Sequence, residues 1–304
     1  MHVTVLGAGT MGHGIAQVAG LAGHTVSLRD VDQDRVDAGL DAIESNLDGG
    51  VDRGKLTRDE QVSTLANIEG TTDLADACTD ADLLVEAVPE DLDLKQRVLQ
   101  DAEAHVPADA VLASNTSSLS VTGIASGLDD PGRFVGLHFF NPVHIMDLVE
   151  VVVGERTDES TTDFATEFVA DIGKTPIEVR DSPGFASSRL GVALGVEAIR
   201  MVQEGVASPR DIDQSMELGY RHPTGPLELT DVVGLDVRLD ILEYLREELG
   251  ERFRPPQLLK QKVRAGKLGK KSGEGFYVWA DGEITGVSGG GRIPDSAGGV
   301  THDD

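Results

Sequence analysis

The first 30 residues carry the pattern that most restricts how this chain can fold. A short β-branched run, HVTVL, is followed by Gly7-Ala8-Gly9-Thr10-Met11-Gly12 and then by a helical stretch, GHGIAQVAGLAG. In a strand–turn–helix unit the first glycine permits the tight turn, the second lets a pyrophosphate approach the backbone, and the third lets helix and strand pack closely. The pattern predicts a βαβ fold whose first helix binds a dinucleotide pyrophosphate at its N-terminus.

Asp30 ends the second predicted strand, about 20 residues beyond the glycines, in the run HTVSLRD. A carboxylate at this place binds the ribose hydroxyls of NAD and repels the 2′-phosphate of NADP. The sequence therefore favours NAD as the cofactor, although Arg29 and Arg35 lie close enough to weaken that preference. The alternative to dinucleotide binding is that the glycines form a turn with a purely structural role.

Short β-branched runs alternate with longer amphipathic stretches over the first half of the chain. This alternation is typical of a Rossmann-type, doubly wound α/β fold with a mostly parallel sheet. Segment 31–65 is longer than one crossover helix needs, and it predicts a helical-pair insertion that projects from the sheet. The predicted strands are HVTVL, HTVSL, DLLVEAV, AVLAS and RFVGLHF.

The pattern changes after TPIEVRD, because helical periodicity dominates from Pro183 onward. We therefore expect a Rossmann domain over 1–182, a smaller all-α domain over 183–280 and a disordered tail over 281–304. The stretch GVALGVEAIRMV, in the predicted all-α domain, is more apolar than one small core requires. It indicates a buried subunit interface, or a helix that simply covers the first domain.

The composition excludes several kinds of partner. The chain has 53 acidic against 26 basic residues, a net charge of −27, so nucleic acid and anionic membranes would be repelled. It also lacks a run of about 18 apolar residues, the length that would cross a membrane. A single cysteine, Cys78, excludes an internal disulfide and favours the cytoplasm. Because diffuse charge of this kind needs screening by salt, we hypothesise a halophilic source.

Seven segments occur in one order along the chain: GAGTMGHGIA, VEAVPEDLDLK, SNTSSLS, GLHFFNPV…LVE, DSPGF, PTGPLEL…GLD and GKKSGEGFY. On these segments the chain resembles the L-3-hydroxyacyl-CoA dehydrogenases, the family that includes 3-hydroxybutyryl-CoA dehydrogenase. The resemblance runs from about Val3 to Trp279. It implies NAD as cofactor, an acyl-CoA substrate, a homodimer formed through the helical domain, and reversible oxidation of (S)-3-hydroxyacyl-CoA to 3-oxoacyl-CoA.

Such an oxidation requires a base near neutral pH, and histidine is the usual choice. His138 ends the predicted strand RFVGLHF, and doubly wound sheets bind ligands at the carboxyl ends of their strands. The resemblance makes His138 the catalytic base and Glu150, on a returning strand, the carboxylate that orients it. A glutamate among valines is costly to bury unless it is paired. Without the resemblance, an ordinary core histidine is the simpler interpretation.

The resemblance assigns further roles around this pair. Ser117 would hydrogen-bond the 3-oxygen of the substrate, although it or Ser118 could instead cap the following helix. Asn141 would hold substrate or nicotinamide, although an Asn before a proline also forms turns. Glu90 and Lys95 match positions that the family uses around NAD, and their alternative is a solvated ion pair at the start of a helix.

Three more residues are assigned by the resemblance outside this group. Lys271 matches a cofactor-contacting lysine, and it lies in segment 260–271, which carries five of the eight lysines. Lys55, in the predicted helical pair, resembles a lysine that contacts CoA. Ser188 stands where the family usually has asparagine, so a substrate contact there has a shorter reach. No spacing typical of metal ligands is visible.

Two other functions stay open. A related dehydrogenase could act on a free hydroxy acid or sugar acid, in which case Lys55 and the helical pair would be dispensable. A non-catalytic NAD-binding protein could keep the same fold. The joint presence of His138, Glu150, Asn141 and Ser117 argues against a non-catalytic protein.

Overall fold

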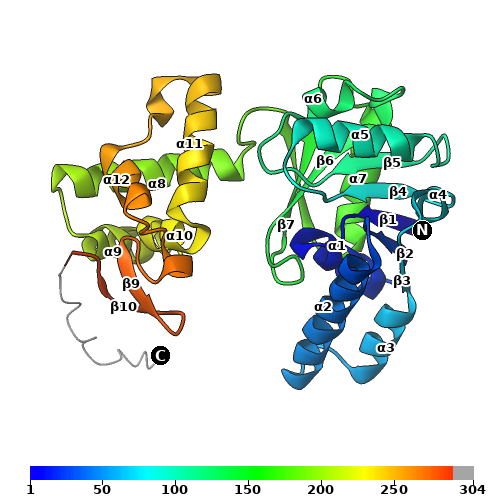
Figure 1. The fold of residues 1–304 in the computed structure, drawn as a ribbon, viewed down its shortest axis with the longest axis horizontal. Coiled ribbons are helices and arrows are strands. Elements are labelled where there is room, and N and C mark those ends of the chain that lie inside the picture. The colour runs from blue at the N-terminus through cyan, green and yellow to red at the C-terminus, as the bar shows by residue number, and fades with distance from the viewer. Residues whose placement is uncertain (290–304) are drawn as a thin grey trace. The chain divides into compact units, whose positions relative to one another are not determined.

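The computed structural model describes residues 1–289 of the chain. These residues fall into two compact units, Met1–Phe185 and a second unit that begins at Ala186 (Figure 1). In the described part of the chain, no helix combines the length and the apolar character that a membrane crossing requires.

The first unit is built on an eight-stranded sheet of order β3-β2-β1-β4-β5-β6-β7-β8. Neighbouring strands run parallel except β6 and β7, which are antiparallel. The chain winds outward from β1 in one direction and then from β4 in the other, so the switch point of the topology lies between β1 and β4, where such sheets bind ligands. The strands are β1 (His2–Leu6), β2 (Thr25–Arg29), β3 (Ile68–Thr71), β4 (Leu83–Glu86), β5 (Val111–Ser114), β6 (Phe134–Phe139), β7 (Leu148–Val153) and β8 (Thr175–Arg180).

Helices cover both faces of this sheet, because its strands are apolar on both sides. One face, with Val5 and Leu137, packs against α1 (Thr10–Leu21) and α7 (Glu159–Asp171). The other face, with Leu84 and Leu112, packs against residues of three further helices. These are α4 (Leu74–Cys78), α5 (Leu92–Glu103) and α6 (Val121–Ala125), and a short 3-10 turn, η1 (Pro131–Arg133), precedes β6. The predicted doubly wound, mostly parallel fold is confirmed.

The predicted helical pair lies between β2 and β3. It consists of α2 (Gln33–Asp52) and α3 (Arg58–Ala66), which extend away from the sheet at the lower end of the first unit in Figure 1. Thr57 and Glu60 form a capping box that starts α3. Lys55 lies exposed in the turn between the two helices.

The second unit is mostly helical. A core that includes Leu227, Leu242 and Tyr277 holds its helices and a small hairpin together. Its elements are α8 (Ser187–Glu204), α9 (Pro209–Tyr220), α10 (Pro226–Val233), α11 (Leu235–Leu249), η2 (Glu251–Phe253), α12 (Gln257–Arg264), η3 (Lys270–Ser272), β9 (Tyr277–Ala280) and β10 (Glu283–Val287).

The hairpin corrects two expectations. The second unit is not all-α, because β9 and β10 pair as an antiparallel sheet. The disordered tail predicted over 281–304 is also wrong for its first residues. Asp281 and Gly282 make the hairpin turn with positive φ, and Ile284 and Val287 of β10 pack on the core of the unit. Residues 290–304 of the predicted tail lie outside the described residues.

Candidate active site

The glycine loop between β1 and α1 has the geometry that its sequence predicts. A side chain on Gly7, whose φ is +103°, would place Cβ 2.8 Å from the carbonyl oxygen of Ala87. At Gly12 a Cβ would lie 1.7 Å from the carbonyl oxygen of Gly7. Nothing lies within 4 Å of a Cβ built on Gly9. The first and third glycines are therefore required by packing, whereas the second borders open space.

That open space belongs to a cavity of about 590 Å³ at the switch point of the sheet. Helix α1 begins there with Gly9 as its N-cap, with no side-chain cap and no acidic residue in its first turn. The N–H groups of an uncapped helix start attract phosphate. The residues of this chain therefore fit a bound dinucleotide. The cavity is lined by Gly7, Ala8, Gly9, Thr10, Met11, Arg29, Asp30, Val31, Arg35, Ala38, Ala87, Val88, Pro89, Leu94 and Val98.

Asp30 lies at the edge of this cavity, directly after β2. Its Oδ2 accepts a hydrogen bond of 2.8 Å from the amide of Ala8, and its Oδ1 accepts one of 2.7 Å from the amide of Val31. These bonds fix the carboxylate and leave lone pairs on both oxygens for ribose hydroxyls. Nη1 of Arg35 lies 3.9 Å from Oδ1, so a cation near the ribose position is present as well.

His138 and Glu150 face each other across β6 and β7, where they occupy paired positions in the antiparallel register. Nδ1 of His138 lies 2.7 Å from Oε2 of Glu150. The glutamate is fully buried and the histidine is 6% exposed. The ring of Phe140 packs 4.4 Å and that of Phe185 5.8 Å from the imidazole, centroid to centroid. Because Nδ1 faces the carboxylate, Nε2 is the nitrogen left to meet a substrate.

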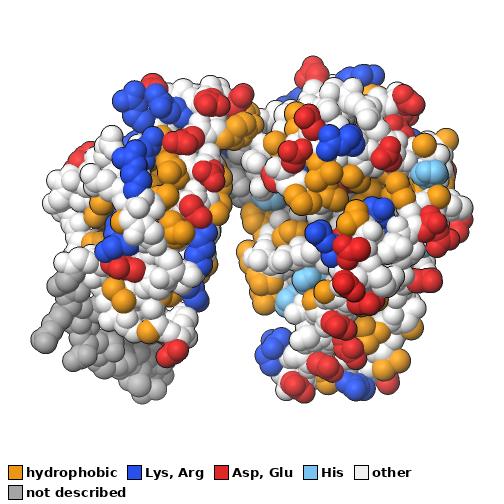
Figure 2. Space-filling view, viewed as in Figure 1, with side chains coloured by type: hydrophobic (Ala, Val, Ile, Leu, Met, Phe, Trp, Pro, Cys, Tyr) orange, Lys and Arg blue, Asp and Glu red, His pale blue; other side chains and the backbone are white. Residues whose placement is uncertain are grey.

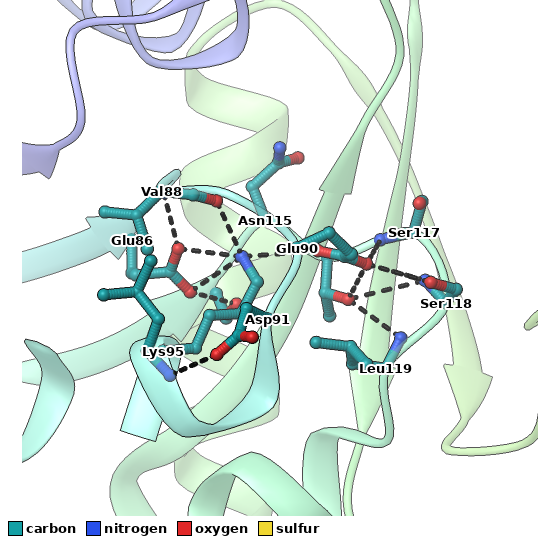
Figure 3. Close-up of polar contacts among 12 residues, drawn as sticks. Glu86, Val88, Glu90, Asp91, Lys95, Asn115, Ser117, Ser118 and Leu119 are labelled. Carbon is teal, nitrogen blue, oxygen red and sulfur yellow. Dashed lines mark hydrogen bonds and ion pairs between the residues drawn. The ribbon is translucent and has the colours of Figure 1, made fainter. Parts of the chain in front are cut away.

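Ser117 lies in the turn that follows β5, and Glu90 holds this turn (Figure 3). Oε1 of Glu90 accepts hydrogen bonds from Oγ1 of Thr116 at 2.6 Å and from the amide of Ser117 at 3.0 Å. It also accepts from the amide of Ser118 at 3.2 Å and from the Ser118 hydroxyl at 3.0 Å. The N-cap of α6 is Ser120, so the alternative that Ser117 or Ser118 caps this helix is wrong.

Lys95 is buried with no exposed surface. Its Nζ lies 2.8 and 3.1 Å from the two carboxylate oxygens of Glu86, 3.2 Å from the carbonyl oxygen of Val88 and 3.4 Å from Oε2 of Glu90. The alternative that Lys95 and Glu90 form a solvated pair is therefore wrong. Lys95 faces Glu90 and has no exposed surface of its own, and its contact with the cofactor stays a prediction.

Glu86 is the residue of this cluster that sequence reasoning missed. It ends β4 with no exposed surface, and it also accepts bonds from the Ser114 hydroxyl and the Val88 amide. Burial raises the pKa of Glu86, and the opposing effects of Lys95 and the hydrogen bonds do not cancel this rise. Burial alone would raise the pKa of Glu90 too, but Lys95 and the donors of the turn bring it below its ordinary value.

The remaining predicted residues are spread over both units. Asn141 is exposed, two residues after the end of β6, and a cis peptide bond joins it to Pro142. Lys271 and Ser188 belong to the second unit, where Nζ of Lys271 lies 2.6 Å from Oδ2 of Asp236 and Ser188 lies in the first turn of α8. Within residues 1–289, no group of three or more His, Cys, Asp or Glu side chains is placed to hold a metal ion.

A histidine backed by a buried carboxylate, in a sheet that carries a dinucleotide cavity, is what nicotinamide-dependent dehydrogenases use. Fold and site thus define a protein of this class. The family model for the NAD-binding domain of 3-hydroxyacyl-CoA dehydrogenase matches residues 2–182, and that for the C-terminal domain matches residues 184–279. The chain belongs to the 3-hydroxyacyl-CoA dehydrogenase family. It is an NAD-dependent enzyme, as the sequence resemblance predicts.

Similar proteins of known sequence and structure agree. A probable 3-hydroxybutyryl-CoA dehydrogenase of Deinococcus radiodurans is 45% identical over 280 residues, 92% of this chain and all of the relative. The human mitochondrial hydroxyacyl-coenzyme A dehydrogenase is 42% identical over 91% of both chains. The crystal structure of (S)-3-hydroxybutyryl-CoA dehydrogenase from Ralstonia eutropha matches with a TM-score of 0.89 at 40% identity, over 92% of this chain and 99% of that one.

Proposed function

We propose that this enzyme oxidises (S)-3-hydroxyacyl-CoA reversibly to 3-oxoacyl-CoA. The 2.7 Å contact between His138 and Glu150 carries the proposal, because it supplies an oriented base in the unit that also holds the glycine loop. The names of the similar proteins support the substrate class. Bound NAD would supply the hydride acceptor for carbon 3.

The residues of the chain would move the proton. Nε2 of His138 removes the proton of the 3-hydroxyl group as carbon 3 is oxidised, which leaves the imidazole positively charged. The carboxylate of Glu150 accepts the Nδ1 hydrogen, fixes the ring orientation and stabilises that charge. In the reverse direction the imidazolium returns the proton to the 3-oxygen.

Two side chains near the strand ends would hold the reacting group. The Ser117 hydroxyl would bind the 3-oxygen. Glu90 fixes the turn by accepting hydrogen bonds from the backbone amides of Ser117 and Ser118, and the Ser117 hydroxyl is not among its donors. Asn141 would contact substrate or nicotinamide through its amide. Lys55 and Ser188 remain our candidates for CoA and substrate binding, and Lys271 for the cofactor.

Oxidation of NADH with acetoacetyl-CoA, compared with free acetoacetate, tests the function. We expect turnover of the CoA ester, and His138→Gln should lower kcat by about 100-fold or more. The matched control is His24→Gln, because His24 is also a buried histidine, 3.1 Å from the carboxylate of Asp171, outside the proposed site. It should keep kcat. A preference for acetoacetate would indicate a free-acid dehydrogenase, and inactivity with both would indicate a non-catalytic protein.

We also propose a homodimer through the second unit. Large apolar side chains on its helices are exposed, among them Leu190 at 71%, Leu218 at 79% and Tyr220 at 75%. Exposed apolar surface of this kind is typical of an interface. Light scattering in concentrated KCl should give twice the chain mass of 32.2 kDa. A monomeric mass would contradict the dimer.

A cytoplasmic location is the last part of the proposal. Cys78 is the only cysteine of the chain, it is buried, and burial raises the pKa of its thiol to about 11. Such a thiol is inert, so nothing about it requires an oxidising compartment. Cell fractionation with an antibody to the chain would test the location, and a secreted pool would contradict it.

A further inference from the structure

The buried cluster around Lys95 links the sheet to the turn that carries Ser117 (Figure 3). Glu86 at the end of β4 holds the ammonium group at 2.8 and 3.1 Å. The same ammonium group lies 3.4 Å from Oε2 of Glu90, whose other oxygen holds the turn. Glu90 therefore has a cation on one side and the turn on the other.

The charges in this cluster constrain one another. Lys95 and Glu86 have no exposed side-chain surface, and Glu90 is 35% exposed. A buried ammonium group is costly unless it is paired, and so is a buried carboxylate. With Glu86 as its nearer partner, Lys95 makes only a long contact with Glu90. Without Glu86, the ammonium group of Lys95 would have the Val88 carbonyl oxygen and Glu90 as its partners, and it would draw Glu90 away from the turn. Without Lys95 as well, Glu90 would lose the cation that holds it beside the turn.

We propose that Glu86 is a positioning residue of the active site: it holds Lys95 at the end of β4, and Lys95 in turn anchors Glu90, which fixes the turn from Thr116 to Ser118. The inference rests on the proposed role of Ser117 toward the substrate oxygen. The side chain of Glu86 has no hydrogen bond to Thr116, Ser117 or Ser118 among those of the described residues, although its backbone carbonyl accepts one of 2.7 Å from the amide of Asn115. It acts through Lys95 and Glu90, with the Ser114 hydroxyl, 2.5 Å from its Oε2, as a further support.

A second ion pair on the same helix provides a matched comparison. Glu103 ends α5 and lies 3.1 Å from Nη2 of Arg133, with side chains only 8% and 14% exposed. Its oxygens also accept bonds from the amides of Asp129 and Asp130. This pair supports a loop at the far end of α5 from Lys95, and it has no bond to the turn of Ser117. A substitution in this pair should therefore change stability without changing the turn.

The experiment compares Glu86→Gln, the double variant Glu86→Gln/Lys95→Met and the control Glu103→Gln. Neutral replacement of both members of a buried pair often preserves stability, so the double variant should melt within about 4 °C of the wild type. We expect kcat with acetoacetyl-CoA to fall by about tenfold or more in Glu86→Gln and in the double variant. Glu103→Gln should lower Tm but keep kcat within about twofold.

Two readouts separate positioning from plain stability. NADH affinity, from fluorescence titration, should change less than about threefold in Glu86→Gln, because the glycine loop, Asp30 and Lys95 are intact. Backbone amides of Ser117 and Ser118 should exchange with deuterium at least about ten times faster than in the wild type and in Glu103→Gln. A stable double variant with wild-type kcat and wild-type exchange overturns the proposal.

The exchange measurement also keeps this inference separate from the proposed function. If the wild type fails to reduce acetoacetyl-CoA but the double variant still shows faster exchange at Ser117 and Ser118, the proposed function fails and the anchoring of the turn by Glu86 and Lys95 stands. If the wild type is active and exchange is unchanged in the double variant, the anchoring fails and the proposed function stands.

Discussion

Nδ1 of His138 lies 2.7 Å from Oε2 of Glu150, and the two residues are direct partners in the register of β6 and β7. This is the antiparallel pair in an otherwise parallel sheet of the first unit. Residues directly opposite each other on antiparallel strands have their side chains on the same face. The reversal of the chain after β6 therefore places a carboxylate beside a histidine within 12 residues, which a parallel crossover could not do.

Replacing this carboxylate by an amide should separate charge from shape. Glu150→Gln keeps an acceptor for the Nδ1 hydrogen but removes the charge that stabilises the imidazolium. We expect kcat to fall by about 100-fold or more. Asp171→Asn, which neutralises the partner of His24, a second buried histidine, is the control and should keep kcat. Steady-state kinetics of both variants with acetoacetyl-CoA would check this, and near wild-type kcat in Glu150→Gln would remove Glu150 from the mechanism.

Asp30 should set the preference for NAD over NADP. Asp30→Asn weakens the acceptor for ribose hydroxyls, removes the charge that repels a 2′-phosphate and leaves Arg35 without this carboxylate. We expect the ratio of kcat/KM for NADH to that for NADPH to fall by about tenfold. The control is Asp73→Asn, since Asp73 is the exposed N-cap of α4, where it accepts a hydrogen bond from the amide of Asp76, and its loss should affect stability alone. An unchanged ratio in Asp30→Asn would assign the preference to other residues.

The parts of the site that the sequence predicted are those fixed by local geometry. The glycine loop and Asp30 directly follow β1 and β2, His138 lies near the end of β6, and parallel strand ends gather at one edge of the sheet. Strand β3, in contrast, was missed, because IEGT is short and polar at Glu69. Its Gly70 is explained only by packing, since a Cβ there would lie 2.4 Å from Cγ1 of Val36 in α2.

The cluster of Glu86, Lys95 and Glu90 was only partly predictable. In a chain with 53 acidic residues, one more glutamate gives no signal by its type. The available signal was its place at the end of the apolar run LLVE, where an unpaired carboxylate would be costly. The partner of Glu86 is Lys95, nine residues later. This pairing depends on how α5 returns along the sheet, which no local sequence pattern fixes.

The stability of the second unit should depend on pH through one buried hydrogen bond. The hydroxyl of Tyr277 lies 2.7 Å from Oδ2 of Asp213, which also accepts bonds from the amides of Leu227 and Glu228. Burial raises the pKa of Asp213, and these bonds only partly offset the rise. The stability gained from its protonated form is therefore present below about pH 4 and is lost as the pH rises through the raised pKa.

Tyr277→Phe removes the donor that stabilises ionised Asp213, so the pKa of this carboxyl should rise further. The loss of unfolding free energy should therefore be larger at pH 7.5, up to about 2 kcal/mol for a charge-assisted bond, and smaller at pH 4.5, because the neutral form of Asp213 gains population as the pH falls toward the raised pKa. Urea unfolding at the two pH values measures the difference. An equal loss at both would show that Asp213 does not change its ionisation in this range.

The net charge of −27 should make folding depend on salt. Acidic side chains are scattered over both units in Figure 2 rather than gathered in one patch. Their mutual repulsion is screened over about 10 Å at 0.1 M salt but about 3 Å at 1 M. We expect the urea midpoint and kcat to rise steeply between 0.1 and 2 M KCl. Screening depends on ionic strength alone, so KBr and KCl should raise the urea midpoint and kcat equally. If the rise came instead from salting-out of apolar surface, the two salts would differ in their effect. A fully folded, active enzyme in dilute buffer would rule out the halophilic source that the charge suggests.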